Sequence, residues 1–385
     1  MAPVNPIKIC VFFILPIIFF CSRPCFADVD WTFSDTNFVN SFRNASGNYQ
    51  AYDFNRFRSR VDFKNDSDSL RANAILDFTS YISRPFIKSD GYQALKDPDP
   101  DLPFNPYMAV FESDDALGRF YLYRLNAEAG LGDSHLVFGL QRIPFGVGRM
   151  WNPTDTFNPI DALSVEPQER LGVFAANYTQ HLGPFSSLQL VSNLKKKGAL
   201  DKYGFRYGGH HWGMDVGLSF IKNADFLMSG VEWASNLLQT GIEVRSELGF
   251  FNNDDLDKTY FSGVAGFEYA FPNNVTLLGE YFYNGLGKDE DGDYDTGVFI
   301  NGNWNLGRHY LGTTVSYELN PLTSLSLSSV YNILDQSFFA GPSVSYSVND
   351  ETTVGLGANV FTGGDVSEFG YYYDNLYYVK FETYF

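Results

Sequence analysis

Residues 119–131 read RFYLYRLNAEAGL, and their side chains alternate in character from one residue to the next. One set comprises Tyr121, Tyr123, Leu125, Ala127, Ala129 and Leu131, and the other comprises Leu122, Arg124, Asn126 and Glu128. Successive residues of a β-strand point to opposite faces, so a period of two predicts a strand with one apolar and one polar face. The same alternation recurs in 239–251, 309–319 and 376–385.

Working outward from this stretch, we identify seventeen such segments: 55–64, 69–81, 119–131, 135–143, 172–181, 187–195, 203–209, 213–222, 226–235, 239–251, 260–271, 275–283, 309–319, 324–333, 338–348, 353–361 and 376–385. A weaker alternation near 36–48 supplies an eighteenth, because single-chain bacterial barrels have an even number of strands. Short turns alternate with longer polar loops, and no stretch after residue 27 is apolar enough for a membrane helix. The sequence therefore predicts an all-β fold, a transmembrane antiparallel up-and-down β-barrel of 18 strands, with 16 as the alternative.

Residues 1–27 predict a cleaved secretory signal peptide. Lys8 supplies the positive charge, the segment from Ile9 to Phe20 is uncharged and apolar, and small residues precede the expected cleavage site after Ala27. The alternative is an uncleaved anchor helix. All three cysteines, Cys10, Cys21 and Cys25, lie in this segment, so residues 28–385 form the barrel without a disulfide.

The composition excludes several classes of protein. The chain has 385 residues, a formal net charge of -18 and 17% aromatic residues. Disordered chains are poor in aromatic residues, and nucleic-acid binding needs a basic surface, so neither class fits. Four predicted external loops, 89–118, 252–258, 284–296 and 362–375, carry a combined charge of -15. An acidic mouth of this kind attracts cations.

Catalytic and metal-binding motifs are absent from the sequence. It contains no G-x-S-x-G, H-E-x-x-H or Walker sequence, and the five histidines are scattered. Residues 289–300 fail the EF-hand pattern, because Tyr294 and Ile300 replace the required Gly and Glu. We therefore expect neither an enzyme nor a protein with a bound cofactor or metal.

The last strand ends in an aromatic residue, Phe385, preceded on the same face by Phe381, Val379 and Tyr377. In this respect the chain resembles the outer-membrane porins of Gram-negative bacteria, although Thr383 departs from their pattern. The resemblance implies a location in the outer membrane, contact with its lipid and lipopolysaccharide, and recognition of Phe385 by the barrel-assembly machinery. It leaves a homotrimer and a monomer both open.

Residues 142–170 contain four prolines and three large aromatic residues, and they predict an ordered loop that folds into the lumen. The segment resembles the G-x-G-R-x-W-N-P-x-D stretch of a group of proteobacterial outer-membrane porins. By analogy with the general porins, such a loop narrows the channel and its carboxylates face arginines. The acidic side would be Asp155, Asp161, Glu166 and Glu169. The basic wall would be Arg56, Arg58, Arg60, Arg124 and Arg142. The alternative is a structural cap whose charges pair locally.

The expected function is that of an outer-membrane porin, a water-filled channel for passive diffusion of small hydrophilic solutes or ions, with a preference for cations. Two alternatives stay open. One is a barrel that sheathes a partner protein, such as a cytochrome of an electron conduit. The other is a membrane-embedded hydrolase. A sheath needs an unobstructed lumen, so the path of residues 142–170 distinguishes it from a porin.

Overall fold

The computed structural model describes residues 28–385 except 44–46, 66, 68, 90–91, 93–95, 97–101, 197–199, 291–293 and 295–304. The predicted signal peptide, 1–27, lies outside the described residues. The described part contains nineteen strands: β1 Asp28–Arg43, β2 Tyr49–Lys64, β3 Leu70–Ile82, β4 Tyr107–Glu112, β5 Ala116–Leu131, β6 Ser134–Gln141, β7 Val173–Gly183, β8 Ser186–Leu194, β9 Leu200–His211, β10 Met214–Lys222, β11 Phe226–Asn236, β12 Glu243–Asn253, β13 Lys258–Ala270, β14 Val275–Tyr283, β15 His309–Asn320, β16 Thr323–Asn332, β17 Phe338–Ser347, β18 Thr352–Thr362 and β19 Leu376–Tyr384. The helical segments are short: α2 Arg84–Ile87, η2 Leu237–Gln239 and α4 Glu368–Tyr371.

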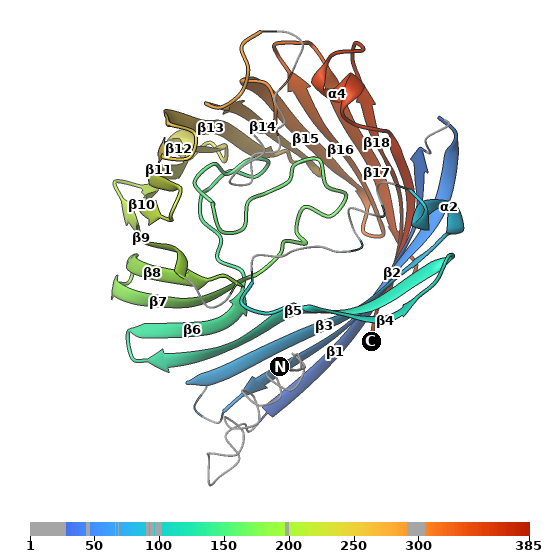
Figure 1. Cartoon of the computed structure of the whole chain (residues 1–385). Helices are drawn as coiled ribbons and strands as arrows, with labels where there is room; N and C mark the ends of the chain where they lie inside the picture. Colours follow the sequence, from blue (N-terminus) through green and yellow to red (C-terminus); the bar gives the residue numbers. More distant parts are fainter. Residues whose placement is uncertain are drawn as a thin grey trace.

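The strands form one closed antiparallel barrel (Figure 1). Consecutive strands pair with each other, and β1 pairs with β19 from Ser34 opposite Tyr384 to Asn40 opposite Tyr378. β4 stands outside this ring, because β3 pairs directly with β5 and β4 pairs only with β5. The ring therefore has 18 strands, and the predicted fold is confirmed.

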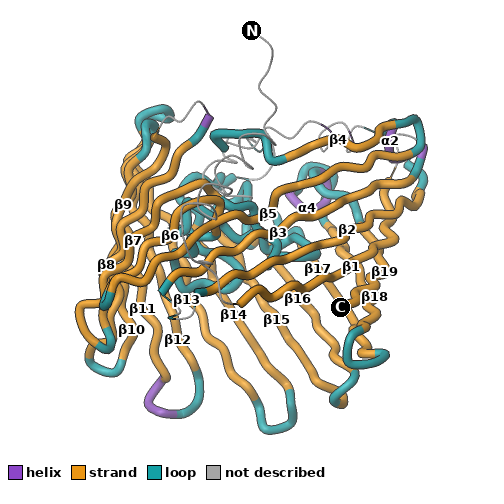
Figure 2. Tube along the Cα trace, turned by 90° about the horizontal axis from the view of Figure 1, so that it is seen from below, coloured by secondary structure: helices purple, strands orange, loops and turns teal. Residues whose placement is uncertain are grey.

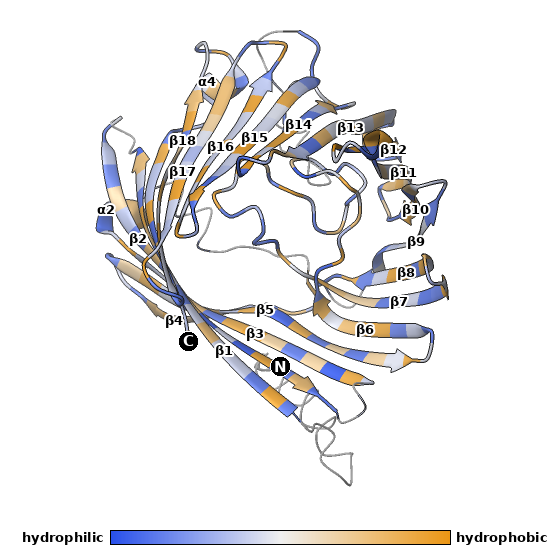
Figure 3. Cartoon of the chain, turned by 180° about the vertical axis from the view of Figure 1, so that it is seen from behind, coloured by the Kyte–Doolittle hydropathy of each residue, from blue (hydrophilic) through white to orange (hydrophobic). Residues whose placement is uncertain are grey.

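The two faces of the barrel wall differ in polarity. Along each strand apolar and polar residues alternate, which Figure 3 shows as alternating bands. Large apolar side chains point outward and are exposed, among them Leu76, Phe250, Leu311, Leu327 and Phe381. In lipid this exposed apolar surface is the favourable one, whereas the inward face can be polar because it lines water.

Within the described residues, no helix is long and apolar enough to span a membrane.

The stretch 119–131 departs from strict alternation. The pairing of β3 with β5 shifts between Ile75 opposite Arg124 and Leu76 opposite Leu122, so Tyr123 is an extra residue in a β-bulge. The prediction that Tyr121 and Tyr123 share the lipid-facing side with Leu125 is wrong. Tyr121 stands opposite Asp77, and Tyr123 lies beneath the guanidinium of Arg58 at 4.1 Å. A bulge changes which face the following residues occupy, and periodicity alone does not reveal it.

A second departure concerns the predicted loop 89–118, which contains β4. β6 ends at Gln141 and pairs with β5 only from Leu125 to Leu131. The remaining edge of β5 would otherwise expose unpaired backbone groups, and β4 covers it from Leu117 to Tyr121.

Short turns and long connections lie at opposite ends of the barrel (Figure 2). The end with α2, α4 and β4 carries the long connections, and the other end carries the turns and η2. We call these the loop end and the turn end.

A pair of neighbouring substitutions tests the assignment of faces. Leu327, which is 44% exposed, points outward from the middle of β16, and Ser326 points inward. Leu327→Arg should destabilise the barrel by roughly 2–4 kcal/mol, because it places a charge in hydrocarbon. Ser326→Arg should have little effect on stability. Denaturant unfolding in phospholipid vesicles measures both, and equal effects would contradict the assignment.

Candidate functional site

Residues 142–172, which connect β6 to β7, form an inner loop across the barrel interior (Figure 1). Its large apolar side chains pack against the wall in two places. Phe145 and Phe157 join a cluster with Met228 and Phe251 on β11 and β12. Trp151 stacks on Phe282 of β14, with ring centroids 5.3 Å apart. This buried apolar surface explains why the loop is ordered rather than solvated.

The two Asn-Pro pairs of the loop hold its limbs together. The Asn158 side chain accepts a hydrogen bond from the Ile143 amide (2.6 Å) and donates one to the Leu171 carbonyl (2.5 Å). The Asn152 side chain accepts from the Ile160 amide (3.1 Å) and donates to the Phe145 carbonyl (3.1 Å). Each amide side chain therefore ties together two segments that are distant in sequence.

Two of the four predicted acidic residues bond to the backbone of their own loop rather than to the predicted arginines. Asp155 is 1% exposed and accepts hydrogen bonds from the amides of Phe157 and Asn158, and burial raises the pKa of Asp155 to about 6. Asp161 is half-buried and accepts from the Leu163 amide (3.0 Å). Both side chains cap the turns of their own loop, as Asp after Asn-Pro commonly does.

The other two acidic residues meet the basic wall. Arg56 donates both terminal nitrogens to Glu166 (2.9 and 3.0 Å). Arg58 donates to Glu169 (3.0 and 2.9 Å) and also to Asp77 of β3 (2.7 Å). These are direct bidentate pairs, and no open water separates the two sets of charges. The ion pairs hold Glu169 in its charged form, which lowers its pKa.

Among the described residues, the remaining arginines of the basic wall make no ion pair with Glu166 or Glu169, although Arg124 contacts the same Tyr123 ring as Arg58. Arg60 is exposed and pairs with Asp62 on its own strand. Arg124 lies over the Tyr123 ring at 3.9 Å and donates to the Arg170 carbonyl (2.7 Å). Arg142 is half-buried, and no described residue accepts a hydrogen bond from its buried Nε.

Sequence reasoning missed several partners of the loop. Lys380 of β19 contacts Glu166 at 3.2 Å, and Asp77 shares Arg58 with Glu169. Glu247 and Glu280 accept hydrogen bonds from the loop backbone. Glu247 lies on the polar face of the predicted strand 239–251, so the sequence indicated that it points inward. Alternation does not identify what an inward side chain contacts.

One predicted acidic loop contains a buried carboxylate. Glu368 of α4 is 0% exposed and accepts hydrogen bonds from the Tyr310 hydroxyl (2.5 Å), the Asn332 side chain (2.8 Å) and the Leu306 amide (3.1 Å). Glu368 therefore does not belong to the exposed negative charge of the predicted acidic loop 362–375. Its bonds tie its own connection to the β14–β15 connection at Leu306 and to the loop-end parts of β15 and β16, and burial raises its pKa to about 7.

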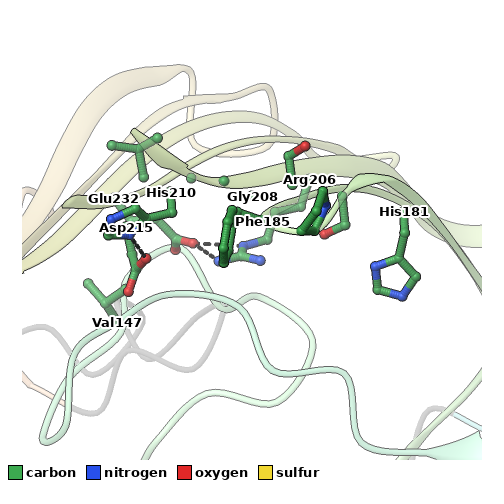
Figure 4. Close-up of a pocket in the computed structure, with 14 residues that line it drawn as sticks. Val147, His181, Phe185, Arg206, Gly208, His210, Asp215 and Glu232 are labelled. Carbon is green, nitrogen blue, oxygen red and sulfur yellow. Dashed lines mark hydrogen bonds and ion pairs between the residues drawn. The ribbon is translucent and has the colours of Figure 1, made fainter. Parts of the chain in front are cut away.

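A cavity of about 550 Å³ lies between the inner loop at Val147 and the wall at β7–β11 (Figure 4). Arg206 pairs with Glu232 inside it, and the His210 ring contacts Asp215 at 2.8 Å. His211 contacts the Tyr207 hydroxyl instead, so the adjacent histidines have separate partners. Among the described residues, no three His, Cys, Asp or Glu side chains are grouped as a metal site would require.

Solved structures with a similar fold include OccAB4 of Acinetobacter baumannii, which has a TM-score of 0.59 and 11% identity and covers 94% of this chain and 98% of its own. OpdK of Pseudomonas aeruginosa, solved with vanillate, has a TM-score of 0.59 and 12% identity over 94% of this chain and 99% of its own. A BenF-like porin from Pseudomonas fluorescens Pf-5 has a TM-score of 0.58 and 9% identity over 94% and 99%. No protein-family model and no curated protein matches this sequence. The chain therefore has the fold of these outer-membrane porins.

Asn158 offers a test of how the inner loop holds its shape. Asn158→Ala would leave the Ile143 amide and the Leu171 carbonyl without their partner, at a cost of about 1–3 kcal/mol for the buried Ile143 amide. Hydrogen exchange at Ile143 should accelerate accordingly, whereas exchange at the centre of β16 should not change. Unchanged hydrogen exchange at Ile143 would contradict the proposed role of the Asn158 hydrogen bonds.

The buried position of Glu368 predicts that the stability of the loop end depends on pH. Its pKa is about 7 when buried and 4.5 in its ordinary state, so the folded loops bind a proton that the opened loops release. The stability of this cluster should fall by roughly 3 kcal/mol as the pH rises from about 4.5 to 7, and should then stay level. Hydrogen exchange of the Leu306 amide, corrected for its intrinsic rate, measures this fall, and Glu368→Gln should abolish it.

Proposed function

We propose that this chain is an outer-membrane porin, a water-filled channel for passive diffusion of small hydrophilic solutes or ions with a preference for cations. The observation that carries the proposal is the inner loop. It occupies part of the lumen of a closed 18-stranded barrel and is bonded to the wall on several sides. A fixed loop that occupies part of a polar lumen narrows the channel without blocking it.

The support for cation preference comes from the acidic residues at the mouth of the barrel and not from the charges beside the inner loop. Carboxylates neutralise the inner arginines: Glu166 and Glu169 pair with Arg56 and Arg58. Asp254 and Asp255 lie in the β12–β13 connection at the loop end, within an acidic stretch. Asp254 contacts Lys222 at 3.5 Å, and Asp255 and Asp257 add further negative charge to this connection. A net negative charge at an entrance raises the local cation concentration.

The two alternative functions have less support. A sheath around a partner protein needs an open lumen, which the inner loop occupies. A hydrolase needs a nucleophile beside a base, and the histidines His210 and His211 contact Asp215 and Tyr207 rather than a serine.

Planar-bilayer recording of the refolded protein tests the proposal. We expect ohmic steps, with a reversal potential in a KCl gradient that indicates cation preference and grows at low ionic strength. Asp254→Asn with Asp255→Asn should lower the permeability ratio roughly 1.5-fold, because surface charge is removed from the mouth. Replacing both with Glu keeps the charge and is the matched control. Absence of conductance would contradict the channel, and anion preference would contradict the cation selectivity.

A further inference from the structure

Two carboxylates of the barrel wall lie directly beneath the first half of the inner loop. Glu247 of β12 is 1% exposed and Glu280 of β14 is 3% exposed. A buried carboxylate needs hydrogen-bond donors or a cation to replace the water it has lost. Arg245 lies near Glu280, but its closer contacts, at 2.7 and 2.8 Å, are with Glu268 and Glu243. The donors to Glu247 and Glu280 come mainly from the loop.

Glu247 binds the loop at two points. Its Oε2 accepts from the amides of Val147 (2.5 Å) and Gly148 (3.0 Å). Its Oε1 accepts from the amide (3.2 Å) and the hydroxyl (3.3 Å) of Thr154. Glu280 continues the series, accepting from the amides of Arg149 (2.7 Å), Met150 (2.8 Å) and Trp151 (3.3 Å).

Five consecutive backbone amides, from residue 147 to residue 151, are therefore directed at two wall carboxylates. Successive amides that converge on one point form an anion-binding concavity, and here a side chain of the same protein fills it. Both oxygens of both carboxylates act as acceptors, and every donor from the loop except the Thr154 hydroxyl is a backbone amide.

Glycine residues allow the loop backbone to come this close to the wall carboxylates. Gly146 has φ +81°, and a Cβ atom there would overlap Oε2 of Glu247. A Cβ atom on Gly148 would overlap the Trp151 carbonyl. Gly146 is thus explained by close contact with the wall, and Gly148 by close packing of the loop backbone against itself.

We infer that Glu247 and Glu280 are the positioning residues of the inner loop and that they set the width of the channel. This inference rests on the proposed function. Glu247 and Glu280 hold the half of the loop near residues 146–154 through buried hydrogen bonds, and salt weakens buried interactions little. The opposite half is held by Glu166 and Glu169, whose side chains are 20% and 28% exposed.

Glu247→Gln and Glu280→Gln test the inference. Glutamine turns one acceptor oxygen into an amide group, which would face the donor amides of the loop. We expect each variant to raise single-channel conductance about 1.5-fold, and the double variant to raise it further. The matched control is Glu318→Gln, which removes the same charge from an exposed position at the turn end.

A thiol readout makes the test independent of conductance. Thr156 is 2% exposed and residues 28–385 contain no cysteine, so Thr156→Cys supplies a single buried probe. A water-soluble thiol reagent should modify it about tenfold faster in the Glu247→Gln or Glu280→Gln background than alone, because the loop moves off the wall. Faster modification without any conductance would support the positioning role and contradict the channel.

A loop-side variant covers the case in which a wall variant fails to fold. Gly146→Ala changes no strand, yet its methyl group would displace the loop from Glu247, so it should reproduce both effects. Gly132→Ala is its control, because Gly132 also has a positive φ (+70°) but nothing lies within 4 Å of its added Cβ. Unchanged conductance and unchanged thiol reactivity in Gly146→Ala and in the folded wall variants would overturn the inference.

Discussion

A strand inside a bilayer has no water to satisfy its backbone, so every strand needs a partner on both sides. In this protein the constraint is met where the first strand meets the last. Seven residue pairs join β1 to β19, and Phe385 exchanges hydrogen bonds with Phe33 (2.9 and 3.3 Å) beyond the end of β19. Closure at this seam assigns one face of every strand to lipid and the other to the lumen, and the polarity pattern of the sequence follows from that assignment.

The inner loop follows from the same constraint. Irregular backbone at membrane depth is tolerated where protein or lumen water satisfies it, and it is excluded from lipid. Asn152 and Asn158 satisfy part of the loop backbone from within, and wall carboxylates satisfy another part. The loop is therefore a structural component of the barrel interior, with donors and acceptors distributed between its own side chains and the wall.

The fold was largely predictable because alternation is a local signal. A period of two and an even strand number lead to the 18-stranded ring. Tyr123 was misassigned because a bulge adds one residue without changing the composition of the strand. β4 was missed because its formation depends on where β6 leaves the edge of β5, which is a property of the pairing.

The site was only partly predictable because its contacts depend on the path of the loop. Arg56 and Arg58 share a face by simple spacing, and the structure brings Glu166 and Glu169 to them. Asp155 and Asp161 belong to the same acidic set by composition, yet they bond to their own backbone. Local turn chemistry separates the two groups, whereas charge alone does not.

Glu166 also bears on the order of assembly. It contacts Arg56 on β2 and Lys380 on β19, the two strands that flank β1, so a residue from the middle of the chain fastens the seam from inside. Contacts between residues so far apart in sequence form late, because a long chain segment must first be ordered. The bonds of Glu166 to Arg56 and Lys380 need β2 and β19 in place on either side of β1. The final position of the loop and the closure of the barrel therefore depend on each other.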